Sequence, residues 1–175
     1  MTCPPVLGFA AYSGTGKTQL LTLLIPLLKQ HGLRVGVIKH SHHDFEIDHP
    51  NKDSYKLRAA GASPTMIVSP YRRAVIVESK NSAPISLSQE LAIFPSEGLD
   101  IVLVEGFRHE VFPKIEIHRP SLAKALLFPQ DENIIAIASD QPIPTPASLA
   151  CLDLNAPETI ADFIIHNFLS ASHEY

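Results

Sequence analysis

The sequence predicts a three-layer α/β fold in which a mostly parallel, doubly wound sheet carries helices on both faces. Short apolar runs alternate with segments of helical periodicity along most of the 175 residues, which is the order typical of a parallel sheet. A glycine-rich turn joins the first apolar run, residues 6–10, to a leucine-rich helical segment. The run over residues 101–104 is entirely apolar, as expected of a strand buried on both faces.

Length and composition indicate one globular domain spanning residues 1–175. Hydrophobic residues make up 45% of the chain and charged residues 18%, which is typical of a folded protein of this size. The net charge of −4 predicts no general attraction to nucleic acid or to an anionic membrane. Cys3 and Cys151 lie far apart, which favours reduced thiols in a cytoplasmic protein. We expect no signal peptide, because residues 1–5 lack a basic leader, and no membrane span.

The first elements are a strand, a turn, a helix and a second strand. The strand over residues 6–10 leads through the turn into a helix over residues 18–30, which Gly32 can end. Pro26 removes one backbone hydrogen bond, so we expect a kink or a break near residues 22–25. The next apolar run, residues 34–39, is expected to be a parallel neighbour of the first strand.

The rest of the chain continues the alternation. Asp53 or Ser54 can cap a short helix that ends at Gly61, and the runs over residues 65–68 and 72–78 predict a β-hairpin at an edge of the sheet. The other expected elements are a helix over residues 86–94, strands over residues 101–104, 114–119, 134–138 and 151–154, and a closing helix that begins near residue 157.

The turn over residues 11–18 has the pattern of a phosphate-binding loop, or P-loop. Small residues let successive backbone N–H groups point at phosphates, and the helix that follows adds its positive end. Lys17 is expected to reach the terminal phosphates, and the Thr18 hydroxyl to bind Mg²⁺. Ala11 stands where the strict motif has its first glycine, without preventing the turn. The predicted cofactor-binding residues are Ser13, Gly14, Thr15, Gly16, Lys17 and Thr18.

Charged residues at the ends of two further strands are expected to complete this site. A P-loop needs an acidic group at the carboxyl end of a neighbouring strand, and Glu105 follows the buried run there. We therefore predict Thr18 and Glu105 as metal ligands, and Lys17 and Glu105 as catalytic residues. Lys39 ends its strand and is expected either to face the terminal phosphate or to be solvated.

The loop over residues 40–44 is open to two interpretations. His40, His42, His43 and Asp44 lie close enough in sequence to form a transition-metal site, although their spacing is not that of a known zinc site. In the interpretation we favour, the loop is solvated or faces phosphate, and Asp44 contributes to Mg²⁺ binding through water.

Asp140 follows a buried strand, at the edge where an open α/β sheet exposes its ligand crevice. A carboxylate there can accept hydrogen bonds from both N1–H and N2–H of guanine, and adenine has no such pair of donors. Asp140 is therefore predicted to favour GTP over ATP, the alternative being a turn or cap aspartate.

Five segments in the same order along nearly the whole chain resemble the molybdopterin-guanine dinucleotide biosynthesis adapter family. Only the P-loop is specific by itself, and the others are informative through their order and spacing. The segments are Ser-Gly-Thr-Gly-Lys-Thr at residues 13–18, Ile-Lys-His-Ser-His-His-Asp at 38–44, Lys-Asp-Ser-Tyr at 52–55, Leu-Val-Glu-Gly-Phe-Arg-His-Glu at 103–110 and Ala-Ser-Asp at 138–140.

The resemblance implies a homodimeric, GTP-binding accessory protein with slow, Mg²⁺-dependent GTP hydrolysis. Its implied partner is the guanylyltransferase that attaches GMP to molybdopterin. The resemblance implies the same roles that we infer from the residues themselves: residues 14–18 bind phosphate and Mg²⁺, Glu105 binds the metal or water, and Asp140 binds the base. Arg108 and His109 match the family segment after the glycine, and we assign them no chemical step. Four arginines are candidates for an arginine finger in cis or across a dimer: Arg58, Arg72, Arg73 and Arg108.

Two other classes of function remain open from the sequence. One is a small-molecule kinase or an ATP-dependent ligase of the dethiobiotin-synthetase type, with an acceptor substrate bound by the loop over residues 40–44. The other is a protein that uses nucleotide only to set the shape of a partner surface.

Overall fold

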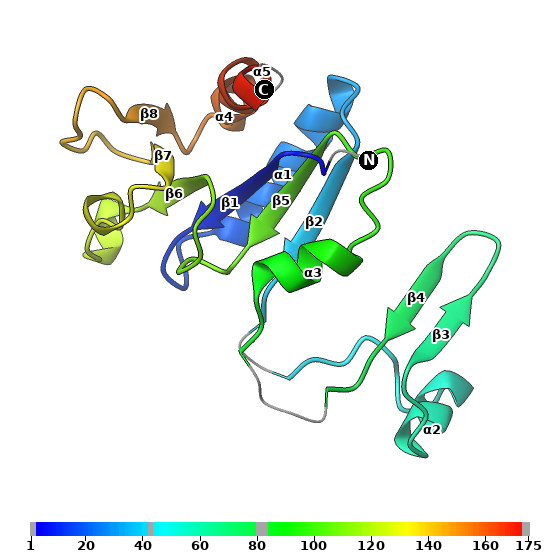
Figure 1. The fold of residues 1–175 in the computed structure, drawn as a ribbon. Coiled ribbons are helices and arrows are strands. Elements are labelled where there is room, and N and C mark those ends of the chain that lie inside the picture. Colours follow the sequence, from blue (N-terminus) through cyan, green and yellow to red (C-terminus); the bar gives the residue numbers. More distant parts are fainter. Residues whose placement is uncertain (1–2, 42–43, 80–83, 173–175) are drawn as a thin grey trace. The chain divides into compact units, whose positions relative to one another are not determined.

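The computed structural model describes residues 3–41, 44–79 and 84–172, which belong to two compact units (Figure 1). Unit 1 comprises residues 1–40 and 86–175, and unit 2 comprises residues 41–85. The single domain expected over residues 1–175 stays a prediction, because a division into compact units does not decide whether they fold together.

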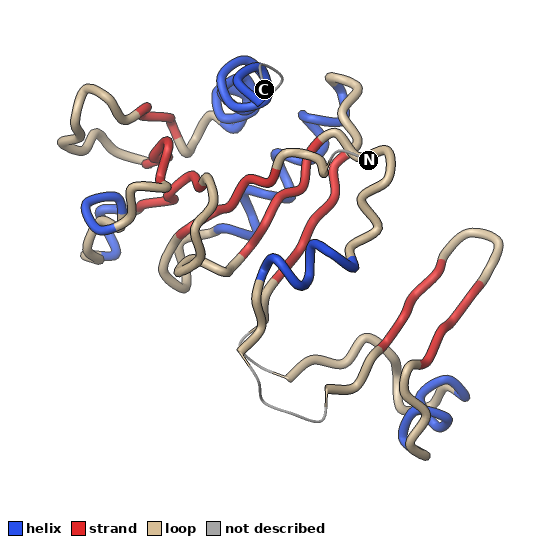
Figure 2. Tube along the Cα trace, in the orientation of Figure 1, coloured by secondary structure: helices blue, strands red, loops and turns tan. Residues whose placement is uncertain are grey.

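Unit 1 is built around a six-stranded sheet of order β2-β5-β1-β6-β7-β8, in which every pair of neighbours is parallel. Figure 2 shows the strands in red. From β1 the chain first builds the sheet in one direction and then in the other, so the carboxyl end of β1 lies at the point where the strand order reverses. The predicted doubly wound parallel sheet is confirmed. The strands are β1 (Val6–Ala10), β2 (Val35–Lys39), β5 (Ile101–Glu105), β6 (Lys114–His118), β7 (Ile134–Ser139) and β8 (Ala150–Asp153).

The position of β2 corrects one prediction. β2 is parallel to β1, but β5 lies between the two strands and pairs with both. The four residues from Ile101 to Val104 in β5 are completely buried, whereas β2 exposes Val37 and Lys39. An entirely apolar strand removes the most surface from water in an interior position, so β5 lies inside the sheet and β2 at its edge.

Helices cover both faces of this sheet (Figure 1), which confirms the three layers. On one face lie α1 (Lys17–Gln30) and α4 (Pro157–Phe163), and α4 continues into a π-helix, η3 (Ile164–Leu169), and α5 (Ser170–Ser172). On the other face, α3 (Leu87–Ile93) packs against Val102 and Val104 of β5. None of the helices in the described part of the chain is long and apolar enough to cross a membrane.

Helix α1 continues through Pro26, so the break considered from the sequence is absent. A proline inside a helix costs about 3 kcal/mol. Four leucines of α1 are buried in the core between the helix and the sheet, and each contributes roughly 1.5–3 kcal/mol. Packing therefore outweighs the loss of one backbone hydrogen bond.

Unit 2 contains a short helix, α2 (Asp53–Ala59), and an antiparallel hairpin of β3 (Thr65–Val68) and β4 (Arg73–Ile76). The predicted hairpin is therefore present. It forms a separate two-stranded sheet, and the larger sheet has β2 and β8 as its edges.

Strand β6 buries charged side chains that its sequence alternation does not predict to be buried. All five of its residues are buried. Ile115 and Ile117 join the core beneath α1, so Lys114, Glu116 and His118 point to the opposite face. Glu116 accepts backbone hydrogen bonds from Leu127 and Phe128 at 2.9 Å each. Lys114 forms an ion pair with Asp131 at 2.9 Å. The segment before β7 thereby supplies partners for the buried charges of Glu116 and Lys114.

Glu116→Gln is expected to change how stability depends on pH. Burial raises the pKa of Glu116 above its ordinary value of 4.5, against the lowering effect of the two backbone N–H groups. In the window between 4.5 and the raised pKa, the folded state holds a proton that the unfolded state has released, so stability falls as pH rises. The free energy of unfolding of the wild type relative to Glu116→Gln should fall through that window and then level off in urea titrations. A pH-independent difference would contradict this account.

Candidate functional site

The P-loop lies at the carboxyl end of β1 and leads directly into α1. Gly14 and Gly16 have φ values of 82° and 96°, a left-handed conformation that glycine adopts readily. The buried Thr15 donates its hydroxyl proton to the carbonyl oxygen of Tyr12 at 2.9 Å. The first N–H groups of α1 have no partner within the helix, so the loop over residues 13–18 presents donors suited to an anion.

Lys17 is folded back over the loop that precedes it. Its Nζ donates to the carbonyl oxygens of Ala11 and Tyr12 at 3.1 and 3.0 Å. Burial lowers the pKa of Lys17, the carboxylate of Glu105 raises it, and the positive charges of Arg108 and Lys39 lower it. A phosphate would offer this ammonium a stronger partner than two neutral carbonyls.

Thr18, Glu105 and Lys39 meet beside the loop, from α1 and the paired strands β5 and β2. The Thr18 hydroxyl lies 2.9 and 3.1 Å from the two carboxylate oxygens of Glu105. Lys39 Nζ lies 3.3 Å from both Thr18 Oγ1 and Glu105 Oε2. A hydroxyl and a carboxylate are the oxygen ligands that Mg²⁺ prefers, so these donors fit the predicted metal.

Gly106 allows the strand ends to approach closely. Its φ is 111°, and an added Cβ would lie 2.7 Å from Cβ of His40. His40 also stacks on Phe107, with ring centroids 4.5 Å apart. The first histidine of the loop over residues 40–44 therefore packs against the residue after Gly106.

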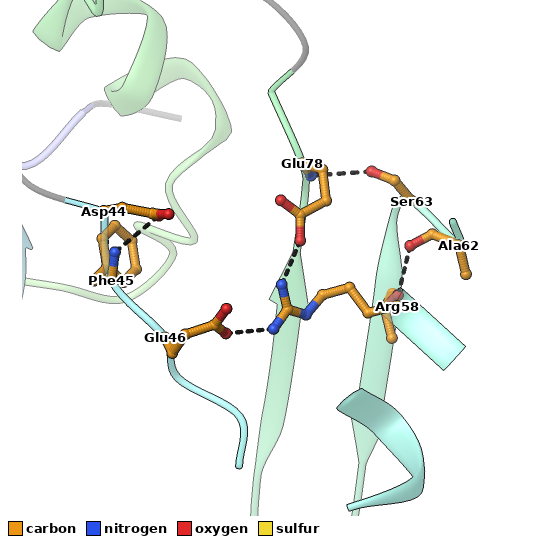
Figure 3. Close-up of polar contacts among 8 residues, drawn as sticks. Asp44, Phe45, Glu46, Arg58, Ala62, Ser63 and Glu78 are labelled. Carbon is orange, nitrogen blue, oxygen red and sulfur yellow. Dashed lines mark hydrogen bonds and ion pairs between the residues drawn. The ribbon is translucent and has the colours of Figure 1, made fainter. Parts of the chain in front are cut away.

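The transition-metal alternative for this loop depends in part on His42 and His43, which lie outside the described residues. Among residues 3–41, 44–79 and 84–172, no group of three or more His, Cys, Asp or Glu could hold a metal ion. Asp44 belongs to unit 2, where its Oδ1 accepts a hydrogen bond from the backbone N–H of Phe45 at 2.9 Å (Figure 3).

Two of the four candidate arginine fingers have defined partners. Figure 3 shows Arg58 of unit 2 between two carboxylates, with Nη1 bound to Glu78 at 2.6 Å and Nη2 bound to Glu46. Arg108 of unit 1 lies over the ring of Tyr12, 5.6 Å from its centroid. Arg108 is therefore the candidate beside the P-loop within its own unit, and Arg72 and Arg73 are exposed.

Asp140 follows β7 directly and lines a pocket of about 410 Å³. The residues that line this pocket include Pro142, Ile143 and Asn155. Asp140 Oδ2 forms an ion pair with Nη1 of Arg119 at 2.6 Å. The proline-rich stretch that follows β7 thus contributes a wall to this pocket.

Sequence reasoning did not identify Arg119 as part of the site. Besides the ion pair with Asp140, its Nε donates to the carbonyl oxygen of Thr15 in the P-loop at 2.9 Å. Arg119 follows β6 and Asp140 follows β7, and these two strands pair. The positions of the two residues could have indicated their contact, but only once the pairing of β6 with β7 was known.

Comparison with known proteins identifies the family of this chain. The sequence profile of the family described as "Molybdopterin guanine dinucleotide synthesis protein B" matches residues 6–140. The molybdopterin-guanine dinucleotide biosynthesis adapter protein of Escherichia coli is 44% identical over 94% of this chain and 93% of its own length. That of Haemophilus influenzae is 42% identical over 95% and 93%.

A solved structure has the same fold. The crystal structure of a molybdopterin-guanine biosynthesis protein B superposes with a TM-score of 0.69 and 28% identity, over 91% of this chain and 97% of that chain. The two relatives and the solved structure each cover more than nine-tenths of this chain, and the profile covers residues 6–140. The chain belongs to the molybdopterin guanine dinucleotide synthesis protein B family.

Proposed function

We propose that the chain binds GTP and Mg²⁺ and serves as an adapter to the guanylyltransferase of molybdopterin guanine dinucleotide synthesis. The observation that carries the nucleotide part is the contact of Thr18 with Glu105 beside a P-loop over which Lys17 is folded, at the point where the strand order reverses. The names of the relatives support the adapter part.

The phosphates of GTP lie in the loop over residues 13–18 in this proposal. Backbone N–H groups and the positive end of α1 neutralise part of the phosphate charge, and Lys17 turns from its carbonyl partners to the terminal oxygens. Lys39 adds a second positive charge at the same end, since its ammonium already lies beside Thr18 and Glu105.

Mg²⁺ would be held by Thr18 and Glu105. Their converging hydroxyl and carboxylate oxygens support both assignments. A role of Asp44 in Mg²⁺ binding stays a prediction from the sequence. When bound, Mg²⁺ draws negative charge from the phosphate oxygens and orders them. Glu105 additionally orients water at this position, and Lys17 stabilises charge that develops on the phosphates.

Guanine would occupy the pocket at the end of β7. Asp140 faces the N1–H and N2–H edge, and Pro142 and Ile143 supply an apolar wall for a flat ring. Their position supports a role in base binding for the proline-rich loop.

We propose that GTP hydrolysis is slow and that the guanylyltransferase sets its rate. Arg108 is the candidate to stabilise charge on the terminal phosphate in cis, but it lies over the ring of Tyr12.

A homodimer is part of the proposal. Exposed apolar side chains on the hairpin of unit 2 support it, with Met66, Val68 and Val75 all more than half exposed, because such surfaces mark contact sites.

A second candidate function is a small-molecule kinase or ATP-dependent ligase. A cavity of about 700 Å³ lies beside the P-loop, lined by Tyr12, Arg108 and Phe128 among others. It has room for an acceptor molecule next to the terminal phosphate.

Measurement of GTP and ATP turnover separates these functions. The adapter proposal expects slow GTP hydrolysis that requires Mg²⁺ and changes when the guanylyltransferase is added. Phosphate transfer from ATP to a small acceptor, without effect of the guanylyltransferase, would contradict it and support the kinase. Tight GTP binding with no turnover above background, even when the guanylyltransferase is present, would indicate a protein that uses nucleotide only for binding a partner.

Glu105→Gln is expected to weaken the Mg²⁺-dependent part of GTP binding by roughly tenfold to a hundredfold, the usual cost of losing a group that holds or orients a metal. Titrations with GTP in Mg²⁺ and in EDTA measure that part. The matched control is Asp100→Asn at the opposite end of β5, where the acid pairs with Arg34 at 3.2 Å. Equal Mg²⁺ dependence in the wild type and in Glu105→Gln would remove Glu105 from the metal site.

A further inference from the structure

Arg119 connects the P-loop to the carboxyl end of β7. Its Nε donates to the carbonyl oxygen of Thr15 at 2.9 Å, and its Nη1 pairs with Asp140 Oδ2 at 2.6 Å. The side chains of Arg119 and Asp140 are 30% and 17% exposed, so water screens the pair only partly. One planar guanidinium therefore contacts both regions that the proposed function assigns to the nucleotide.

The sheet places these groups by its register. His118 of β6 pairs with Ser139 of β7, so the next residues, Arg119 and Asp140, leave the two strands side by side. Arginine carries donors on separate nitrogens of a rigid fork, which suits two separated acceptors. A lysine in this position has its donors on one atom and cannot reproduce both contacts.

Asp140 retains one acceptor that Arg119 does not use. Among the described residues, Asp140 Oδ1 is buried and has no hydrogen-bond partner. A buried, unpaired carboxylate oxygen is unfavourable, so a donor that reaches it gains binding energy. When a guanine edge binds Asp140 Oδ1, it shifts the carboxylate, and the other carboxylate oxygen is bound to Arg119. Because Arg119 also donates a hydrogen bond to Thr15, the shift reaches the P-loop.

We propose that Arg119 is a positioning residue that couples guanine recognition at Asp140 to the geometry of the P-loop. The inference rests on the proposed binding of GTP. Coupling of this kind is reciprocal. Binding of the base raises the affinity of the loop for phosphate, and bound phosphate raises the affinity of Asp140 for the base. An Asp140 substitution should then have a smaller effect once Arg119 is replaced.

The test is a double-mutant cycle in calorimetric titrations with GTP and with inorganic tripolyphosphate, which has no base. The proteins are the wild type, Arg119→Lys, Asp140→Asn and the double variant. Arg119→Lys should weaken GTP binding by about tenfold, the usual effect of losing a charge-assisted hydrogen bond, and should weaken tripolyphosphate binding less. Asp140→Asn should have a smaller effect on GTP affinity in the Arg119→Lys background than in the wild type. Arg34→Lys, which alters the arginine paired with Asp100, is the matched control and should leave both affinities unchanged.

Independent effects of the two substitutions would overturn the coupling while leaving the proposed function in place. Equal losses for GTP and tripolyphosphate in Arg119→Lys would overturn it as well, because they would make Arg119 a general support of the loop. Wild-type protein that binds tripolyphosphate and GTP equally well would overturn the base site, and the inference with it. Absence of GTP binding by the wild type would overturn the proposed function itself.

Discussion

Lys17→Ala is expected to weaken GTP binding by at least about a hundredfold, because each lost charge-assisted hydrogen bond to a phosphate oxygen is worth roughly 1.5–3 kcal/mol. The loop itself should persist, since its glycine conformations and the Thr15 contact with Tyr12 do not involve Lys17. Calorimetric titration of GTP in Mg²⁺ measures the effect. Lys29→Ala, in the last turn of the same helix, is the matched control. Unchanged affinity in Lys17→Ala would contradict the P-loop assignment.

The same lysine predicts a dependence on pH. Phosphate binds the protonated ammonium, and the pKa of Lys17 is lowered from 10.5, chiefly by burial. GTP affinity should therefore decline with rising pH at lower values than an ordinary lysine would give. Lys29→Ala should follow the wild type, and Lys17→Ala should lack this decline.

Asp140→Asn is expected to reduce the preference for GTP over ATP by roughly tenfold to a hundredfold. Asparagine replaces one acceptor by a donor, which then faces a donor of guanine, and a mismatched buried polar pair costs about 1–3 kcal/mol. Titrations with both nucleotides give the ratio. Asp162→Asn, on the exposed side of α4, is the matched control. A ratio that stays at the wild-type value would leave Asp140 as a partner of Arg119 only.

The elements of the fold could be predicted from local patterns, and their order in the sheet could not. The apolar run over residues 101–104 shows that a strand is buried on both faces, but not which strands flank it. Pairing of β5 with both β1 and β2 joins residues far apart in sequence, and no local pattern encodes that choice. Pro26 failed to break α1 for a related reason, since the buried leucines act through tertiary packing.

The candidate site divides in the same way. The P-loop is one continuous segment, so spacing alone indicated its residues. Thr18 and Glu105 could be linked because a known chemical need connects them, and their atoms lie within hydrogen-bond distance. Arg119 could not be found, because its role depends on two contacts, 104 and 21 residues away in sequence. Its only local feature is that it follows β6, whose sequence alternates as that of an amphipathic strand does.

Titration of the wild type with GTP and separately with ATP, in Mg²⁺, tests most directly whether this P-loop protein prefers GTP. We expect a clear preference for GTP, with a lower affinity when EDTA replaces Mg²⁺. Equal binding, or preference for ATP, would contradict the base site at Asp140 and favour the kinase or ligase.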